Sequence, residues 1–345
     1  MKRHLSHSES FSTELIEWMR GKSPILIVTH DHPDPDALAA SYALRHLLLV
    51  KTGQEATIAF GGGIGRGENK VMVQRLEIPT VPIDKLNLEH FNVVCMVDCQ
   101  PGTGNNAIPA DAKVDLVIDH HALRGETEAC RWVDVRPDYG AAASILFEYL
   151  VAQQVKIATK LATLLFYAIK SETQSLGRDW TGADREAYLQ LLPLSNNRIL
   201  YEITHPKSPR EYFRYFDCGL KNAQIYEDLL VFNLSQVDHP EIVAEIADFL
   251  MRVEGVNLVL GIGCYREEGV LSLRTSSPEL RAGVLIRTIT EGLGTAGGHG
   301  MTAGGQIRPM PKDECGRKEL EVRLVARLFA ALERDVPDPQ LLVEG

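Results

Sequence analysis

Residues 24–41 read PILIVTHDHPDPDALAAS and place three signals in a row. The uninterrupted apolar run at 24–28 predicts a buried strand, because strands covered on both faces lack alternation. A polar turn containing Pro33 and Pro35 follows, and helical spacing of apolar residues then runs from Ala37 to Val50. A strand joined to a helix in this way is half of a βαβ unit, so this stretch predicts a mainly parallel α/β sheet.

The rest of the first half repeats this pattern. Short apolar runs predict buried strands at 55–60, 92–97 and 115–118, and helical spacing predicts helices at 141–153 and 158–170. Strand runs separated by helices indicate one parallel sheet covered on both faces.

The second half changes character. A mostly helical pattern runs over 182–236, with a break at THPKSP, 204–209, and a helix expected at 210–232. The last part predicts strands at 256–265 and 269–276, a helix at 279–292, a glycine-rich loop at 294–305 and a helix at 317–333. With 345 residues and about 100–200 residues per domain, we expect two domains, over 1–195 and 237–345, joined by a helical linker at 196–236.

Composition excludes several classes of protein. The net charge of -10 argues against wrapping long duplex nucleic acid. The six cysteines are scattered and form no C-x-x-C pair, which favours reduced thiols in a cytoplasmic protein. No run approaches the ~20 apolar residues of a membrane span. MKRHLSHSES at the start lacks the apolar segment of a secretory signal.

The stretch FGGGIGRGEN at 60–69 is rich in glycine but matches neither phosphate-loop pattern. Its glycines do not fit G-x-G-x-x-G, and no G-K-[ST] follows. We expect a flexible turn between a strand and a helix, with a substrate-facing loop as the alternative.

Acidic and imidazole side chains follow three of the predicted strands. Ligands of α/β sheets bind at the carboxyl ends of strands, and those of one parallel sheet meet at one edge. Carboxylates with imidazoles suit manganese, magnesium, iron or zinc. The candidate ligands are His30, Asp34, Asp36, Asp98, Asp119, His120 and His121. Five or six ligands from these three loops would suit two metal ions sharing a carboxylate, as in many phosphatases and nucleases. The alternative for the first loop is a solvated turn with Asp36 as a helix N-cap.

These motifs resemble the DHH phosphoesterase family. The family carries an Asp-x-Asp motif, a strand-end Asp, an Asp-His-His motif and a fourth acidic motif, in the order found here. The fourth motif usually contains Asp, whereas Ser171-Glu172-Thr173 stands at this place in the chain. The longer Glu172 side chain could still reach a metal ion.

The C-terminal part resembles the DHH-associated domain of the oligoribonuclease and RecJ-like branches. Residues 296–304, AGGHGMTAG, are similar to its G-G-G-H-x-x-A-A-G loop, and SLRTSS to its Ser-x-Arg-Ser segment. The implied substrate-binding residues are Arg274, Gly297, Gly298 and His299. Glycines admit backbone N–H groups close to a phosphate, and arginine binds phosphate in a bidentate manner. The plainer alternatives are a surface ion pair for Arg274 and a tight turn for the glycines.

The resemblance also implies a role for each site residue. One manganese ion would be held by His30, Asp34 and Asp98. A second would be held by Asp36, Asp98, His120 and Glu172, so that Asp98 bridges the pair. Asp119 would orient His120, and His121 would stabilise charge on phosphoryl oxygens. The residues expected to act in catalysis are Asp36, Asp98, His120 and His121.

The resemblance implies a hydrolase with a parallel-sheet catalytic domain at 1–195, a smaller α/β substrate-binding domain at 237–345 and an active site between the domains. We expect a manganese-dependent phosphoesterase, with magnesium or another divalent ion as a substitute. Its substrates would be short oligonucleotides, linear or cyclic dinucleotides, or 3′,5′-bisphosphorylated adenosine. The alternatives are a RecJ-like single-strand exonuclease and a nucleotide sensor with a degraded metal site. No membrane partner is expected, and a homodimer is left open.

Overall fold

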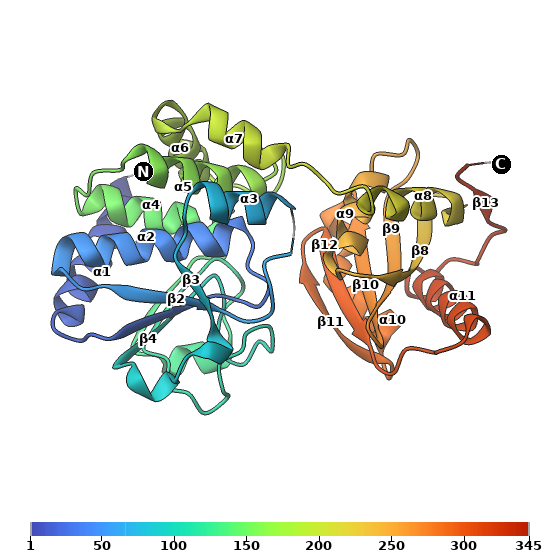
Figure 1. The fold of residues 1–345 in the computed structure, drawn as a ribbon, viewed down its shortest axis with the longest axis horizontal. Coiled ribbons are helices and arrows are strands. Elements are labelled where there is room, and N and C mark those ends of the chain that lie inside the picture. The colour runs from blue at the N-terminus through green and yellow to red at the C-terminus, as the bar shows by residue number, and fades with distance from the viewer. Residues whose placement is uncertain (1, 66, 344–345) are drawn as a thin grey trace. The chain divides into compact units, whose positions relative to one another are not determined.

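The structure is a computed structural model that describes residues 2–65 and 67–343, without the side chains of residues 2–5, 278 and 299 (Figure 1). The chain divides into two compact units, Met1–Pro206 and Lys207–Gly345. Each unit has its own sheet and its own hydrophobic core. An α/β fold with a parallel N-terminal sheet and a second, smaller sheet-containing unit is therefore confirmed.

The first unit is built on six parallel strands in the order β3-β2-β1-β4-β5-β6. The strands are β1 (Ile25–Val28), β2 (Ala56–Phe60), β3 (Thr80–Pro82), β4 (Val93–Val97), β5 (Leu116–Asp119) and β6 (Trp132–Val135). The four strands predicted from apolar runs are all present. The strands β3 and β6 were not predicted, because each is at most four residues long and is only partly buried.

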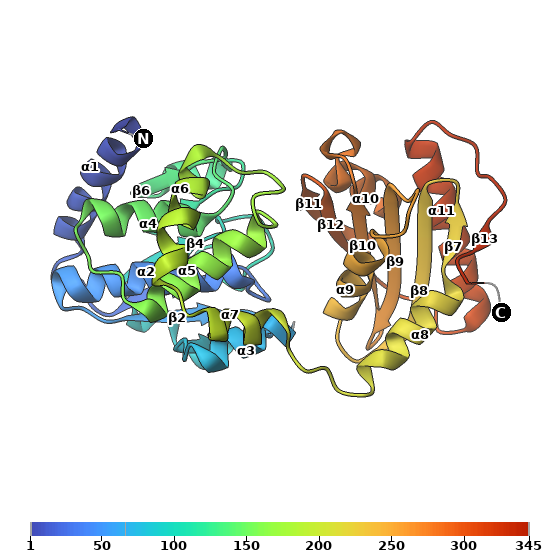
Figure 2. The same ribbon diagram turned by 90° about the horizontal axis from the view of Figure 1, so that it is seen from above.

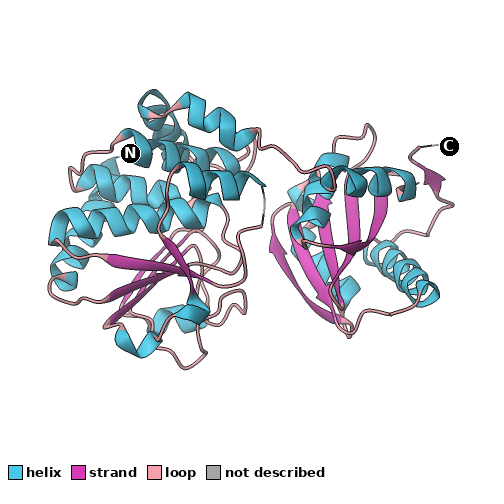
Figure 3. Ribbon diagram, viewed as in Figure 1, coloured by secondary structure: helices cyan, strands magenta, loops and turns pink. Residues whose placement is uncertain are grey.

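Helices lie over one face of this sheet, some on the strands and others on neighbouring helices (Figure 3). They are α1 (Lys2–Met19), α2 (Pro35–Thr52), α3 (Gly67–Arg75), α4 (Ala142–Ala152), α5 (Thr159–Glu172), α6 (Gly182–Leu191) and α7 (Asn197–Thr204). The main core forms where α2, α4 and α5 pack on the strands. The opposite face is covered by loops and by the 3-10 turns Ile83–Lys85 and Leu88–His90, so helical cover of both faces is not what is observed.

The strand order places a topological switch point between β1 and β4. The chain leaves β1 through α2 toward β2 on one side, whereas β4 and β5 extend the sheet on the other side. Loops diverge at such a point, and ligands of open α/β sheets bind there, beyond the carboxyl ends of the strands. The turn at residues 29–34 and the strand-end residue Asp98 both lie at this position.

The second unit contains a seven-stranded mixed sheet in the order β11-β12-β10-β9-β8-β7-β13 (Figure 2). The strands are β7 (Gln224–Tyr226), β8 (Leu229–Val237), β9 (Leu258–Tyr265), β10 (Glu268–Thr275), β11 (Gly294–His299), β12 (Thr302–Ile307) and β13 (Gln340–Leu341). The pair β8–β9 is parallel and the other pairs are antiparallel.

Helices cover both faces of the second sheet. Two of them, α8 (Tyr212–Asn222) and α9 (Glu241–Leu250), pack on one face around Phe232 and Val243. The others, α10 (Ala282–Thr290) and α11 (Glu314–Ala331), enclose the core on the opposite face. None of the helices among the described residues is long and apolar enough to cross a membrane.

Two elements of the second unit differ from the sequence predictions. The helix predicted at 210–232 ends at Asn222, and the apolar run that follows forms β7 and β8, because a short apolar run does not distinguish a buried strand from a helix. The glycine-rich loop predicted at 294–305 is the hairpin β11–β12. Its backbone lies close to α10: a Cβ on Gly283 of that helix would lie 2.0 Å from the carbonyl oxygen of Gly298.

Residues 196–236, where a helical linker was expected, contribute to both units. The helix α7 packs into the first core through Leu200 and Ile203. Residues 205–211 form neither helix nor strand, in agreement with the break predicted at THPKSP. The helix α8 and the strands β7 and β8 belong to the second unit.

A candidate metal centre

The turn after β1 delivers three candidate ligands. Asp34 is the N-cap of α2: its Oδ1 accepts a hydrogen bond from the Ala37 N–H at 3.0 Å, and Pro35 follows at the first helical position. The N-cap is therefore Asp34 and not Asp36. His30 turns its Nδ1 to the Asp31 carbonyl oxygen at 2.8 Å and its Nε2 toward Asp34 Oδ2 at 3.7 Å.

Asp36 fastens α2 to α4. Its side chain is buried, and its two oxygens accept hydrogen bonds from the N–H groups of Ala142 and Ala143 at 2.6 and 2.8 Å. Those N–H groups lie at the start of α4, where the helix dipole favours a negative charge. Asp36 Oδ2 also lies 3.8 Å from His120 Nε2. The same carboxylate thus faces the candidate centre and connects two core helices.

Asp98 lies in the middle of the cluster. It follows β4 directly and takes a left-handed backbone conformation, with φ of 59°, which aspartate tolerates better than most residues. Its Oδ2 lies 3.6 Å from His30 Nε2, and its Oδ1 lies 3.3 Å from His120 Nε2. Oδ1 is buried and makes no hydrogen bond to a described residue. A buried carboxylate oxygen without a hydrogen bond is costly, and a bound cation would satisfy it.

The two histidines after β5 are oriented by different acceptors. The Tyr139 carbonyl oxygen lies 3.1 Å from His120 Nδ1, which leaves His120 Nε2 facing Asp98. Asp119 Oδ1 lies 2.8 Å from His121 Nδ1 and accepts a hydrogen bond from the His120 backbone N–H. The expected partner of the His120 ring, Asp119, therefore contacts the ring of His121 instead.

Gln100 is a residue that the sequence analysis missed. It is buried two positions after Asp98, and its Nε2 donates to Asp119 Oδ2 at 2.6 Å. Its Oε1 accepts hydrogen bonds from the Arg124 N–H and the Thr127 hydroxyl. Gln100 thereby holds Asp119, and through Asp119 it holds His121. The sequence does offer a signal for Gln100: it is a polar residue two positions after Asp98, a candidate ligand that directly follows a predicted strand.

Among the described residues, two groups of side chains are compact enough to hold metal ions. His30, Asp34 and Asp98 form one, and Asp98, His120 and His121 form the other, with ligand atoms within 4.8 Å of one another in each group. Asp98 belongs to both. The first group is the set expected for one ion. In the second group, His121 stands beside Asp98 and His120, whereas Asp36 and Glu172 were expected there.

The charges of the cluster are strongly perturbed. Burial would raise the pKa of Asp98, but attraction to His120 and His30 holds it well below its usual range. Burial would lower the pKa of His30, but its carboxylate neighbours raise it well above the usual value. Burial and the negative charge of Asp98 raise the pKa of Asp36. The buried carboxylates therefore repel one another, and a bound cation would relieve this repulsion. A donor set of imidazoles and carboxylates fits a divalent ion such as manganese.

Glu172 lies at the C-terminal end of α5 and belongs to the same electrostatic environment. Burial and the charge of Asp34 raise the pKa of Glu172 to about 7. Glu172 is not part of either compact ligand group among the described residues. The backbone then turns sharply, because Gln174, Ser175 and Leu176 all have positive φ.

The glycine-rich stretch after β2 lies against the turn after β1. A Cβ on Gly61 would lie 1.9 Å from Asp31 Oδ1, and His32 Nδ1 lies 3.0 Å from the Gly63 carbonyl oxygen. The close approach requires glycine at position 61. These contacts place the stretch beside the candidate centre, where it connects β2 to α3.

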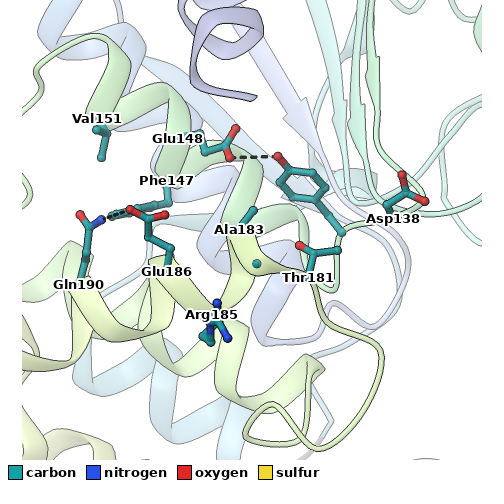
Figure 4. Close-up of a pocket in the computed structure, with 11 residues that line it drawn as sticks. Asp138, Phe147, Glu148, Val151, Thr181, Ala183, Arg185, Glu186 and Gln190 are labelled. Carbon is teal, nitrogen blue, oxygen red and sulfur yellow. Dashed lines mark hydrogen bonds between the residues drawn. The ribbon is translucent and has the colours of Figure 1, made fainter. Parts of the chain in front are cut away.

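A cavity of about 460 Å³ lies beside α4 and α6 in the first unit (Figure 4). Its walls include Tyr139, Phe147 and Glu148, and the Tyr139 hydroxyl donates to Glu148 at 3.0 Å. None of the candidate metal ligands lines it. Its connection to the centre is Tyr139, whose carbonyl oxygen lies beside the His120 ring.

The expected substrate-binding residues lie in the second unit. Arg274, Gly297 and Gly298 line a surface depression of about 290 Å³, here called the β10 hollow. Its other lining residues are Pro240, Ala244, Val270, Leu271, Ser272, Thr302, Ala303 and Gly304. The side chain of His299 lies outside the described residues. Arg274 forms an ion pair with Asp248 of α9, so the ion pair considered as its plainer alternative is present.

A family model and a longer relative match this chain. Residues 24–169 match the model described as the DHH family, N-terminal domain. An uncharacterised protein of Methanocaldococcus jannaschii is 30% identical over 318 residues, which are 90% of this chain and 64% of that protein. The chain therefore spans just under two thirds of this relative's length.

A second relative and a solved structure are also similar. A probable manganese-dependent inorganic pyrophosphatase of Lactiplantibacillus plantarum is 23% identical over 148 residues, which are 43% of this chain and 47% of that protein. The crystal structure of an exopolyphosphatase-related protein from Bacteroides fragilis has a TM-score of 0.74 and 15% identity, and the match covers 96% of this chain and 98% of that one. At this identity, the likeness supports the fold.

Proposed function

We propose that this chain is a manganese-dependent phosphoesterase acting on short nucleotides, and the match of residues 24–169 to the model of the DHH-family N-terminal domain supports this proposal. One observation carries the proposal: Asp98 is buried between His30 and His120 and belongs to both compact ligand groups. A shared carboxylate is typical of the two-metal centres that hydrolyse phosphate esters. The manganese dependence ascribed to the Lactiplantibacillus relative supports the choice of ion.

In this proposal, each ion has its own ligands and shares Asp98. Two bound divalent ions supply positive charge to the phosphoryl oxygens and allow water to act as a nucleophile near neutral pH. One ion would be held by His30, Asp34 and Asp98, and the other by Asp98 and His120 together with Asp36 and Glu172.

Two contacts hold ligands of this set in position. The Tyr139 carbonyl oxygen lies beside His120 Nδ1 and keeps His120 Nε2 directed at the centre. The turn after β1 is fixed by Asp34, whose Oδ1 accepts a hydrogen bond from the Ala37 N–H. That bond uses Oδ1 and leaves Oδ2, the oxygen nearer to His30, facing the centre.

His121 has a separate role in this proposal. Its ring is held by Asp119, which is held in turn by Gln100. A histidine fixed in this way beside Asp98 can donate a hydrogen bond to a phosphoryl oxygen and stabilise the charge that develops there. We expect the β10 hollow, in the second unit, to bind an anionic group of a short substrate.

A substrate panel with manganese tests the proposal. The panel contains dinucleotides, cyclic dinucleotides, 3′,5′-bisphosphorylated adenosine, a long single strand and inorganic pyrophosphate. We expect turnover of the short nucleotides, and its loss in Asp98→Asn. Asp84→Asn, at an exposed position after β3, is the matched control and keeps full activity. Turnover that survives in Asp98→Asn would contradict the proposal.

Inorganic pyrophosphate is the second candidate substrate, because the Lactiplantibacillus relative is a probable pyrophosphatase. That similarity covers 43% of this chain. Exclusive hydrolysis of pyrophosphate in the panel would favour this candidate over nucleotides.

A further inference from the structure

The β10 hollow contains a buried hydroxyl group without a partner. Ser272 and Arg274 are two positions apart on β10, so both side chains leave the same face of the strand, toward α9. Ser272 is 2% exposed and lines the hollow, and its Oγ makes no hydrogen bond to a described residue. A buried hydroxyl is normally hydrogen-bonded, so this group points to a ligand that accepts or donates there.

Arg274 supplies the positive charge of the hollow. It is 9% exposed, and its Nη1 donates to the carbonyl oxygens of Leu273 and Ala303 at 3.1 and 3.5 Å. Its Nε donates to Asp248 Oδ1. Within the described part of the chain, Nη2 has no hydrogen-bond acceptor, so its N–H groups are available to a ligand.

Asp248 cancels this charge. It lies near the end of α9 with a side chain that is 41% exposed, and it forms the ion pair with Arg274. The pair is neutral as a whole, although the guanidinium still offers donors. An anion in the hollow is attracted by Arg274 and repelled by Asp248, so Asp248 cancels much of the attraction that a second negative charge would gain from Arg274. The cost of removing the anion from water still rises with its charge, and this favours a singly charged group.

We propose that Asp248 determines which anionic group the hollow binds, and that the pair selects a singly charged phosphodiester over a doubly charged terminal phosphate. The inference rests on the proposed function in one respect, that the bound group is part of the substrate. It also changes the expectation from the sequence, in which Arg274 holds a terminal phosphate. Asp248 is here a specificity-determining residue that acts through Arg274.

Anion binding to the full-length chain tests the inference without any turnover. The probes are dimethyl phosphate, a monoanion, and sulfate, a dianion of similar size, each titrated by calorimetry at fixed low salt. Binding that is lost in Arg274→Gln is assigned to the hollow. We expect the wild type to bind dimethyl phosphate at least as tightly as sulfate in this component.

Asp248→Asn removes the charge and keeps the shape of the side chain. We expect sulfate to bind about a hundredfold more tightly and dimethyl phosphate about tenfold, because the coulombic energy scales with the charge of the ligand. Asp248→Glu keeps the charge and should keep the wild-type preference. Glu254→Gln, at an exposed position, changes the net charge equally and should have no effect.

Two results would overturn the inference. One is a wild-type hollow that prefers sulfate, and the other is an equal gain for both anions, or no gain, in a folded Asp248→Asn variant. Should that variant not fold, a changed preference in Asp248→Glu would count against the inference instead. A lack of phosphoesterase activity would contradict the proposed function, whereas the anion titrations would still test the role of Asp248, because they measure binding without turnover.

Discussion

At the scale of single residues, the candidate ligands differ in how much of the fold depends on them. Asp34 caps its own helix, whereas Asp36 accepts two hydrogen bonds from the start of α4. In the sequence, both are candidate ligands on one loop. The structure separates them, because only Asp36 links two helices of the core.

The first prediction compares these two aspartates. Asp36→Asn should lower the free energy of unfolding by about 1–3 kcal/mol, because an amide replaces one of two buried acceptors with a donor. Asp34→Asn should leave stability nearly unchanged, because asparagine is an equally good N-cap. Urea unfolding in the presence of a chelator measures both. Equal stability of the two variants would contradict the role of Asp36 in joining the helices.

The second prediction concerns Glu172. If it is a metal ligand, Glu172→Asp should shift the manganese concentration that half-saturates activity, because the carboxylate moves by about one methylene. Stability measured with a chelator should change little. Manganese titrations that superimpose for the wild type and the variant would place Glu172 outside the ligand set.

The third prediction is a pH dependence of stability. Burial opposes the charge of Asp134, but Arg136 outweighs burial and lowers the pKa of Asp134 below its usual value. A carboxyl group with a lowered pKa stabilises the fold above its unfolded pKa of about 4, and the gain disappears as the pH falls through its folded pKa. Asp134→Asn should therefore be less stable near neutral pH and lose less stability on acidification.

Urea unfolding from about pH 7 to about pH 3 measures this difference. Asp84→Asn, which replaces an exposed carboxylate, is the control and should follow the wild type. Parallel stability profiles for the wild type and Asp134→Asn would show that Arg136 does not lower the pKa of Asp134.

At the scale of elements, the apolar strands were predictable and the glycine-rich ones were not. The strands β1, β2, β4 and β5 are continuous apolar runs, and the candidate ligands follow three of them directly. The hairpin β11–β12 carries no such run, because glycine occupies many of its positions, among them Gly305, where a Cβ would lie 3.3 Å from the Thr290 side chain of α10. Glycine weakens a strand signal in sequence, and only the tertiary contact explains its presence.

The candidate site was predictable to a similar extent. Which residues gather at the strand ends follows from sequence position, since parallel strands end at one edge. Which acceptor holds which ring does not, because Tyr139 and Gln100 reach the histidines from other loops. The ion pair of Arg274 could not be predicted either, because its partner Asp248 lies on a helix 26 residues earlier in the chain.

The fourth prediction tests the packing of α10. Gly283→Ala should destabilise the second unit by about 1–3 kcal/mol, because its Cβ would lie 2.0 Å from the Gly298 carbonyl oxygen. Gly297→Ala is the control for stability, since a Cβ there would meet no heavy atom of the described residues within 4 Å, its chain neighbours apart. Urea unfolding measures both. Equal stability would show that α10 moves away from β11 at no cost.

At the scale of the whole molecule, the charge balance bears on substrate length. The chain carries a net charge of -10, and the described cation of the β10 hollow is paired with Asp248. Little positive charge is therefore offered to a long polyanion. This charge balance favours a short substrate over a long strand.

The fifth prediction follows from this balance. The ratio kcat/KM should be highest for oligomers of about two to five nucleotides and should fall for longer strands, because repulsion accumulates with length. A kinetic series from a dimer to an oligomer of about 20 nucleotides, at fixed salt and with manganese, measures it. A ratio that stays level or rises with length would favour a RecJ-like exonuclease.

The bond between Asp36 and the start of α4 has a consequence for descent. In relatives that have lost the activity, selection no longer maintains His30 and Asp34, because neither residue joins two core helices. Selection for a stable fold still maintains Asp36, because its two carboxylate oxygens accept the hydrogen bonds from the start of α4. Relatives that have lost activity should therefore retain the second aspartate while the first drifts, and that aspartate alone is no sign of an active enzyme.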